Sequence, residues 1–271
     1  MFVDGGAMLI IAERINATRK RIGAAFAERD AVFLQDEARR QAQAGADYID
    51  LNAALSPKDE QKLMVWAVEA IRATAGKPLC IDTANPKAAR AALKLLPKGS
   101  AFLNSISGEK ARLREMLPLA VEFETKVVAL AMDDSGMPES CAARWQAIEK
   151  ILAAVDKARV PRERVFVDPL VRPIATSPDQ AAQCLEMIRE LRAKGGGVQT
   201  VIGLSNISYG LPERRHLNRT FLTLAIAAGL SAAILDPLEP DLRATVLASA
   251  CLTGQDAYCM NYIQAQREGQ L

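Results

Sequence analysis

Histidine, net charge and long apolar runs are what this sequence has least of. It contains one histidine in 271 residues, and 34 Lys and Arg against 32 Asp and Glu leave a formal net charge of +2. Such a balance argues against a nucleic-acid-binding protein, which carries a basic stripe. The apolar run at 8–12 is far shorter than the roughly 20 residues that span a bilayer. The first six residues carry an acid where a signal peptide carries bases. We therefore expect a soluble cytoplasmic protein with no nucleic-acid or membrane partner.

Cysteine pairs and low-complexity segments are lacking as well. The five cysteines are odd in number and scattered, with no C-x-x-C pair, so we predict no disulfide framework and expect each thiol to be reduced and buried. Half of the residues are hydrophobic and only 16 are glycine, which excludes a disordered or collagen-like chain.

What the sequence does have is about eight alternations of a short apolar run with an amphipathic segment. The runs are apolar throughout, as in parallel strands that are covered on both faces. The predicted strands are 9–13, 48–51, 79–81, 101–103, 127–131, 165–167, 200–204 and 232–235. The predicted helices are 30–44, 57–75, 86–96, 109–124, 140–158, 178–193, 215–228 and 238–252.

Eight β-then-α units on this length of chain favour a single α/β domain, 1–271, with the TIM (β/α)8 barrel fold. A doubly wound open sheet is the alternative. No G-x-G-x-x-G follows a predicted strand, and the triple glycine at 195–197 precedes a strand instead of opening a helix. A dinucleotide site is therefore not expected.

Polar residues follow every predicted strand. In order along the chain they are Glu13 and Asn16, Asp50 and Asn52, Asp82 and Asn85, Asn104, Asp133, Asp168, Asn206 and Asp236. In a barrel these ends converge on the rim that carries the active site. Each residue could instead cap the next helix, but capping does not explain a polar group on every strand.

The composition of this predicted rim indicates its ligand. Carboxylates and carboxamides without His or Cys make a poor zinc or iron site, although magnesium is conceivable. A carboxylate can accept two parallel N–H bonds from an amino-pyrimidinone ring, and an Asn amide can both donate and accept along its remaining edge. The residues therefore suit a pterin or a purine.

Six separated segments, in order, resemble the pterin-binding methyltransferases. They are LIIAERIN at 9–16, IDLN at 49–52, LCIDTAN at 79–85, LNS at 103–105, VDPL at 167–170 and GLSNIS at 203–208, followed by LNRTF at 217–221. The likeness covers nearly the whole chain and is strongest to the methyltetrahydrofolate:corrinoid/iron-sulfur protein methyltransferases, with the folate domain of cobalamin-dependent methionine synthase more distant.

The resemblance implies a homodimeric barrel without a metal of its own that binds tetrahydrofolate or 5-methyltetrahydrofolate and meets cobalamin on a separate corrinoid protein. The implied pterin-binding residues are Asp82, Asn104, Asp168, Asn206 and Arg214, together with Asp50 and Glu13. Asn206 would lie near N5 of the pterin. Arg215 and the single histidine, His216, depart from the family pattern, and we interpret His216 as a rim or helix-start residue rather than a base.

The implied catalytic residues are Asn206, Asp82 and Asp168. N5 can leave the methyl group only if it gains a proton or a strong hydrogen bond, and the Asn206 amide can stabilise the protonated N5. The proton would arrive through water or the neighbouring aspartates. Asp82 and Asp168 are expected to be ionised and to orient the pterin.

Four basic residues follow the first predicted strand: Arg14, Arg19, Lys20 and Arg21. They could hold the anionic glutamate tail of folate at the rim. They could equally form a solvated surface run. We also expect a wide, shallow mouth that admits the corrinoid protein through a transient interface.

Three alternatives remain. A dihydropteroate synthase would need a pyrophosphate-binding loop near the N-terminus, and the segment ERINAT at 13–18 is unlike it. A non-catalytic pterin-binding module would have no need of Asn206. A Schiff-base aldolase is weak because no predicted strand end presents a lysine. The sequence leaves the direction of methyl transfer and the identity of the corrinoid partner open.

Overall fold

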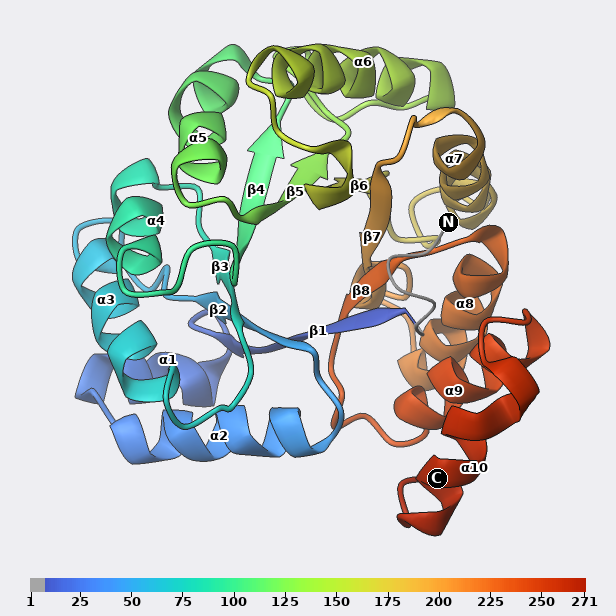
Figure 1. Ribbon diagram of the computed structural model, residues 1–271, viewed down its shortest axis with the longest axis horizontal. Helices are drawn as coiled ribbons and strands as arrows, with labels where there is room; N and C mark the ends of the chain where they lie inside the picture. The colour runs from blue at the N-terminus through green and yellow to red at the C-terminus, as the bar shows by residue number, and fades with distance from the viewer. Residues whose placement is uncertain (1–7) are drawn as a thin grey trace.

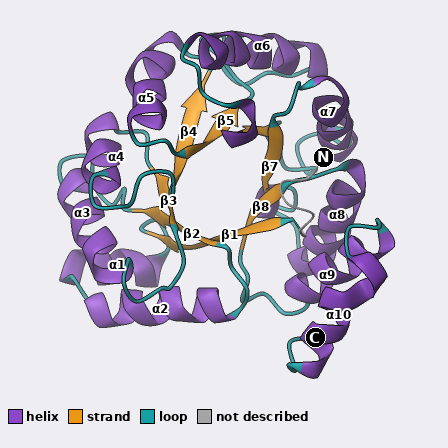
Figure 2. Ribbon diagram, viewed as in Figure 1, coloured by secondary structure: helices purple, strands orange, loops and turns teal. Residues whose placement is uncertain are grey.

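The computed structural model describes residues 8–271, in which eight parallel strands close into a barrel inside a ring of helices (Figures 1 and 2). The strands are β1 (Leu9–Asn16), β2 (Tyr48–Asn52), β3 (Leu79–Asp82), β4 (Phe102–Ser107), β5 (Lys126–Leu130), β6 (Val165–Asp168), β7 (Gln199–Gly203) and β8 (Ala232–Leu235). The helices are α1 (Lys20–Glu28), α2 (Ala31–Gln43), α3 (Glu60–Ile71), α4 (Pro86–Leu93), α5 (Lys110–Glu122), α6 (Cys141–Lys157), α7 (Gln180–Lys194), α8 (Arg214–Ala228), α9 (Leu242–Leu252) and α10 (Met260–Arg267).

The TIM-barrel prediction is confirmed, because each strand pairs in parallel with its sequence neighbour and β1 closes on β8. All eight predicted strands and all eight predicted helices are present, with ends that differ by a few residues. Two helices were not predicted. α1 follows the first strand and contains two of the four basic residues expected at the rim, and α10 follows the barrel, lying outside the ring at the lower right of Figure 1.

Helix starts follow from local hydrogen bonding. The Asn85 side chain accepts hydrogen bonds from Lys87 N and Ala88 N at the start of α4, and Pro86 occupies the first helical position. Ser140 caps α6 in the same way. Asn85, one of the rim candidates predicted from the sequence, is therefore a helix cap.

Two hydrophobic clusters lie on opposite faces of the strands. The larger one fills the space between the outer faces of the strands and the helices and includes Ile49, Leu103 and Ile148. The smaller one fills the lower, amino-terminal half of the barrel interior. Its buried members are Ile11, Tyr48, Cys80, Phe102, Val128, Phe166, Val201 and Ala232.

Lys126 closes the amino-terminal end of this inner cluster. It is the first residue of β5, and its Nζ donates a hydrogen bond of 2.9 Å to Tyr48 Oη. The same ammonium lies 5.4 Å from the centre of the Tyr48 ring and 5.8 Å from that of Phe102. The amino-terminal half of the barrel is therefore a packed core, as is general for this fold.

Two strands carry an extra residue near their carboxyl ends. The pairing of β1 with β2 shifts between Ala12 and Ile15, and that of β4 with β5 shifts between Asn104 and Ile106. Such bulges re-aim side chains and are common next to active sites. The bulge in β1 lies at Glu13 and Arg14. The side chains of these two adjacent residues therefore contact different parts of the protein.

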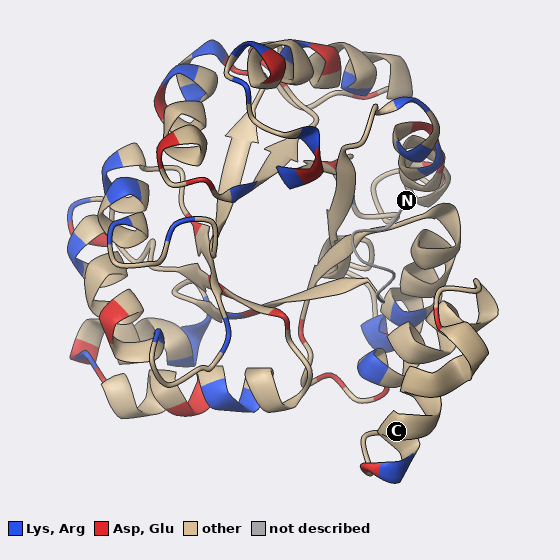
Figure 3. Cartoon of the chain, viewed as in Figure 1, with Lys and Arg blue, Asp and Glu red and all other residues tan. Residues whose placement is uncertain are grey.

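The distribution of charged residues and the burial of the cysteines agree in part with the expectations from the sequence. Lys, Arg, Asp and Glu are interspersed around the ring in Figure 3. A search of residues 8–271 for a helix long and apolar enough to cross a bilayer finds none. All five cysteines are free, and Cys80 and Cys184 are buried as expected. Cys141 and Cys251 are only partly buried, and the expectation is wrong for Cys259, which is exposed in the turn before α10.

Candidate active site

A polar cavity of about 350 Å³ lies at the carboxyl ends of the strands. It is lined by Glu13, Asn16, Thr18, Arg19, Asp50, Asp82, Asn104, Asp168, Gly203, Asn206 and Ile234. The structure therefore brings together six of the seven predicted site residues, from six different strand ends. The seventh, Arg214, lies nearby at the start of α8.

The alternation of side chains along each strand explains this gathering. Residues two apart point to the same face of a strand. Tyr48 belongs to the inner cluster and Asp50 to the cavity; the same relation joins Phe166 to Asp168. Five strands, β1 to β4 and β6, thus contribute an apolar residue below and a polar residue above, whereas β7 and β8 contribute Gly203 and Ile234. The cavity is the upper layer of the barrel interior.

Asp50 and Asp82 form a pair of adjacent buried carboxyls. Burial, and next the neighbouring Asp82 carboxyl, raise the pKa of Asp50 well above its usual value. Burial also raises the pKa of Asp82, opposed by a 2.9 Å hydrogen bond from Asn52 Nδ2 to Asp82 Oδ2. Asp50 Oδ1 is buried without a hydrogen-bond partner. Asp50 also lines the polar cavity, so a ligand donor could satisfy this unpaired acceptor.

Asp168 stands at the end of β6 with a similar environment. Burial raises the pKa of its carboxyl to about 6, opposed by the Leu170 N–H, which donates to Asp168 Oδ1 at 2.8 Å, and by the charge of Arg144. Arg144 is fully buried on α6. Burial therefore shifts these carboxyls toward their protonated forms in the unliganded protein, and the ionised state expected when they pair with pterin N–H groups stays a prediction.

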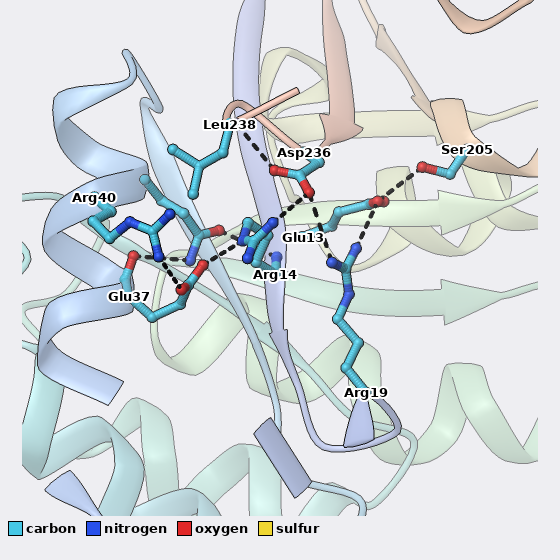
Figure 4. A network of polar contacts seen from close by, with 9 residues as sticks. Glu13, Arg14, Arg19, Glu37, Arg40, Ser205, Asp236 and Leu238 are labelled. Atoms are coloured by element: carbon cyan, nitrogen blue, oxygen red, sulfur yellow. Dashed lines mark hydrogen bonds and ion pairs between the residues drawn. The ribbon is translucent and has the colours of Figure 1, made fainter. Parts of the chain in front are cut away.

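Glu13 is held by a network of polar contacts at the edge of the cavity (Figure 4). Ser205 Oγ and Arg19 Nη2 both donate to Glu13 Oε1, at 2.8 and 3.1 Å. Arg19 also lies 3.7 Å from Asp236, which accepts a 2.8 Å hydrogen bond from Arg14 Nη1. Burial raises the pKa of Glu13, and the Ser205 hydrogen bond and the Arg19 charge oppose that rise.

Asn206 ends the short helical turn Leu204–Asn206 that follows β7, and its side chain is exposed to the cavity. Gly203 leaves room for it: a Cβ at position 203 would lie 3.1 Å from Asn206 Nδ2. The glycine thus sets how closely the Asn206 amide can approach the strand.

Of the four basic residues that follow the start of the first strand, only Arg19 lines the cavity, and Lys20 and Arg21 are exposed residues of α1. Arg14 turns outward, where it contacts Asp236 and, through Nε, Glu37 of α2. Arg21 lies over the Phe33 ring at 4.6 Å. Of the four residues expected at the rim, Arg14 and Arg21 therefore have partners of their own.

Arg214, predicted to bind the pterin, does not line the cavity, and its role toward the pterin stays a prediction. Arg214 Nε donates to Ser208 Oγ at 3.0 Å and Nη2 to Ser205 O at 2.5 Å, so it braces the loop that carries Asn206. Arg215 and His216 are exposed and lie 3.2 and 3.9 Å from Glu213. His216 is a residue of the first helical turn, in agreement with its interpretation.

Two carboxylates that follow predicted strands do not line the cavity. Asp133 lies beyond the end of β5, where hydrogen bonds with Lys150 and Ser135 lower its pKa. Asp236 binds Arg14 and accepts a 3.0 Å hydrogen bond from Leu238 N. For these residues a structural role explains the polar strand end.

Sequence reasoning did not select Thr18, Gly203 and Ile234, which also line the cavity. Gly203 and Ile234 lie two residues beyond the inner-cluster residues Val201 and Ala232, so the strand alternation could have identified them. Within residues 8–271, no group of three or more His, Cys, Asp or Glu residues is arranged to hold a metal ion.

Comparison with known proteins identifies the family. Residues 12–236 match the pterin binding enzyme family, and the chain belongs to that family. It is 30% identical over 266 residues to a methylcorrinoid:tetrahydrofolate methyltransferase from Eubacterium limosum, covering 97% of this chain and 98% of that one. It is 28% identical over 247 residues to methionine synthase from Mycobacterium tuberculosis, covering 86% of this chain and 21% of that enzyme. The family resemblance inferred from the six motifs is thereby confirmed.

Solved structures add support for the fold. Dihydropteroate synthase from Xanthomonas albilineans superposes with a TM-score of 0.68 at 22% identity, covering 94% of this chain and 96% of that one. Dihydropteroate synthase from Thermus thermophilus gives a TM-score of 0.65 at 22% identity, covering 93% of this chain and 96% of that one. At this identity the likeness shows a shared barrel.

Proposed function

We propose that this protein is a methyltransferase that moves a methyl group between N5 of tetrahydrofolate and the cobalt of a corrinoid carried by a partner protein. The observation that carries the proposal is the single cavity that joins Asp82, Asn104, Asp168 and Asn206 at the carboxyl rim. The full-length similarity to a methylcorrinoid:tetrahydrofolate methyltransferase supports it.

The cavity suits the pterin head group in size and chemistry. A volume of about 350 Å³ lies within the range of small-molecule sites. Asp82 and Asp168 can accept hydrogen bonds from the ring N–H and amino groups, while the Asn104 amide can donate and accept along another edge. Asp50 Oδ1, buried without a partner, can accept a further donor. Donors of the pterin would favour the ionised carboxylates that burial disfavours in the free protein.

Asn206 is proposed to act on the reacting nitrogen. In transfer from methyltetrahydrofolate, N5 leaves with the bonding electron pair and must be protonated; in the reverse direction, N5 attacks the methyl group and then loses its proton. The Asn206 amide can orient and stabilise the protonated N5, which lowers the barrier in either direction. Asp82 and Asp168 hold the ring so that the methyl group faces the open rim.

The partner and assembly belong to the same proposal. The corrinoid protein brings its cobalt over the cavity mouth, and we infer a homodimer in the cytoplasm from the family resemblance. Light scattering behind size-exclusion chromatography tests the dimer: a mass near twice 29.3 kDa supports it, and a monomer at micromolar concentration contradicts it.

The decisive experiment uses free methylcob(III)alamin with tetrahydrofolate, and cob(I)alamin with methyltetrahydrofolate, under anaerobic conditions. The expected result is protein-dependent interconversion of the two cobalamin spectra with matching production of methyltetrahydrofolate or tetrahydrofolate. Pterin binding without any transfer would favour a non-catalytic module. Formation of pteroate from hydroxymethyldihydropterin pyrophosphate and aminobenzoate would establish a dihydropteroate synthase instead.

A further inference from the structure

We propose that Glu13 is the proton-transfer residue of this site, the acid that delivers a proton to N5 of the bound pterin and the base that removes it in the reverse direction. This inference rests on the proposed function. It replaces the expectation that the neighbouring aspartates supply the proton, and it gives Glu13 a role beyond binding.

The geometry distinguishes the two oxygens of Glu13. Both hydrogen bonds that hold the side chain, from Ser205 Oγ and from Arg19 Nη2, end on Oε1. Glu13 lines the cavity, and its side chain is 19% exposed. Oε1 is thus the anchored atom, and Oε2, which accepts neither of these hydrogen bonds, is the oxygen available to carry a proton. Figure 4 shows the carboxylate between Ser205 and Arg19.

Ser205 joins Glu13 to the proposed N5 contact. It immediately precedes Asn206 in the turn after β7, so the hydrogen bond to Glu13 connects β1 directly to the loop that presents the amide. Arg214 holds the carbonyl of the same Ser205. Asn206 can therefore orient N5 while Glu13 exchanges the proton, either directly or through one water molecule.

The charges that face Glu13 come from four directions. Arg19, before α1, and Arg214, at the start of α8, favour its ionised form; Asp236, after β8, disfavours it. Asp50, on β2, is a further carboxyl within electrostatic reach. Burial outweighs the two arginines and raises the pKa of Glu13. A carboxyl shifted upward in this way can hold a proton closer to neutral pH than an ordinary glutamic acid can.

The proton balance is the same in both directions. When methyltetrahydrofolate is the donor, the Glu13 proton moves to N5, the N5–CH3 bond breaks with its electron pair remaining on N5, and the methyl group bonds to cob(I)alamin. In reverse, the N5 lone pair bonds the methyl group, the electron pair of the broken carbon–cobalt bond remains on cobalt, and the N5 proton moves to the Glu13 carboxylate. No oxidant or further reactant is required.

The first test compares Glu13→Gln with the wild type in single-turnover methyl transfer from pH 5 to 9. Glutamine keeps an acceptor for Ser205 but cannot exchange a proton, so we expect the rate to fall by about 10²- to 10⁴-fold. The part of the rate–pH profile that reports the titration of Glu13, its pH-dependent limb, should disappear. The matched control is Glu28→Gln, exposed at the end of α1, which should keep the wild-type rate and limb. A Glu13→Gln variant with the wild-type profile overturns the proposal.

A second variant should shift the pH-dependent limb of the rate profile while keeping the Glu13 carboxyl. Arg19→Met takes away the charge and one donor that lower the pKa of Glu13, so the limb should move to higher pH. An unchanged position of the limb contradicts the assignment.

A third measurement does not depend on turnover. Calorimetry of tetrahydrofolate binding in buffers of different ionisation enthalpy counts the protons exchanged on binding. We expect the wild type and Glu13→Gln to differ in this number at pH 5 to 7. If the wild type transfers no methyl groups either, the proposed function fails. If the wild type and Glu13→Gln exchange the same number of protons on binding, only the role of Glu13 is overturned.

Discussion

The interior of the barrel has two layers of side chains that come from the same strands: a lower, amino-terminal layer of apolar residues and an upper layer that lines the cavity at the carboxyl ends. In the lower layer, Phe102 packs edge-on against Tyr48 and Phe166, with ring centres 4.7 and 4.8 Å apart. Two residues further along the same strands lie Asn104, Asp50 and Asp168, which line the cavity. A separation of two residues, roughly 6.6 Å along a strand, thus divides a close-packed apolar core from a set of buried carboxyls.

The difference teaches where stability and activity are located. Aromatic packing in the lower layer stabilises the barrel. The upper layer destabilises it, because desolvation raises the pKa values of Asp50, Asp82 and Asp168 and leaves Asp50 Oδ1 without a partner. Substitutions in the two layers should therefore have opposite consequences for folding and for ligand binding.

The largest expected effect is on the stability of the lower layer. Phe102 is fully buried, and Phe102→Ala should lower the free energy of unfolding by about 3–5 kcal/mol. Urea denaturation measures the loss. Phe102→Leu serves as the milder variant and should cost less while leaving tetrahydrofolate affinity within about threefold of the wild type at a temperature where it is folded, since no ligand contact is removed. A large loss of affinity in folded Phe102→Leu would break the separation of the layers.

The next effect is on catalysis in the upper layer. Asn206→Ala should lower the methyl-transfer rate by about 10- to 1000-fold, as for loss of one preorganised donor, with a smaller change in pterin affinity. Single-turnover kinetics and fluorescence titration measure the two quantities. The matched control is Asn85→Ala, which removes the cap of α4; it should cost about 1 kcal/mol of stability and leave the rate unchanged. Equal losses of rate and affinity in Asn206→Ala would contradict the role of the amide.

The pH dependence of binding tests the carboxyls directly. Because the pKa of Asp168 is about 6 in the free protein, this residue must lose a proton below that pH before it can accept pterin N–H groups. Tetrahydrofolate affinity should therefore fall by up to about tenfold per pH unit below pH 6. Asp168→Asn should bind more weakly at pH 8 and lose this part of the dependence. An unchanged slope in Asp168→Asn would refute the assignment.

The two layers also show how much of the site could be predicted from the sequence. The polar residues near the strand ends predicted much of the upper layer, since Asp50, Asp82, Asn104 and Asp168 all keep the inward register of the apolar residues before them. Asp133 misled because it lies beyond the last β5 residue, in a turn where it binds Ser135 and Lys150. Strand periodicity ends with the strand, so it cannot place a loop residue.

The two unpredicted helices differ in their sequence signal: α1 buries Ile22, Ala25 and Phe26 at helical spacing, a pattern that the sequence analysis did not use, whereas α10 has no such stripe. α1 contains Gly23, which lowers helix propensity but is required here, because a Cβ at this position would lie 2.7 Å from Ala17 O. α10 buries only Ala265 among its residues, so it has no apolar stripe to read. The ion pairs of Arg14 with Glu37 and Asp236 join distant segments and could not be read from local patterns.

A smaller effect is expected from the spacing between β7 and the reacting amide. Gly203 has a φ of −81°, which alanine can adopt, but its Cβ would lie 3.1 Å from Asn206 Nδ2. Gly203→Ala should displace the amide slightly and reduce the transfer rate by roughly two- to tenfold. In the Asn206→Ala background the same substitution should have little further effect. If the effects of the two substitutions on the transfer rate are fully additive, Gly203 does not act through the Asn206 amide.

The smallest effect is a gain of stability in the upper layer. A carboxyl whose pKa is raised in the folded protein stabilises the fold below its usual value of 3.8, and that contribution is lost as the pH rises through the folded pKa. Asp50→Asn avoids ionisation altogether and should stabilise the unliganded protein by about 0.5–1 kcal/mol at pH 8, with a smaller gain at pH 4. Denaturation with and without tetrahydrofolate measures it. Because Asp50 is proposed to accept a pterin donor, the ligand should stabilise this variant less than the wild type; an Asp50→Asn variant destabilised at pH 8 would show that the buried carboxyls support the barrel instead of opposing it.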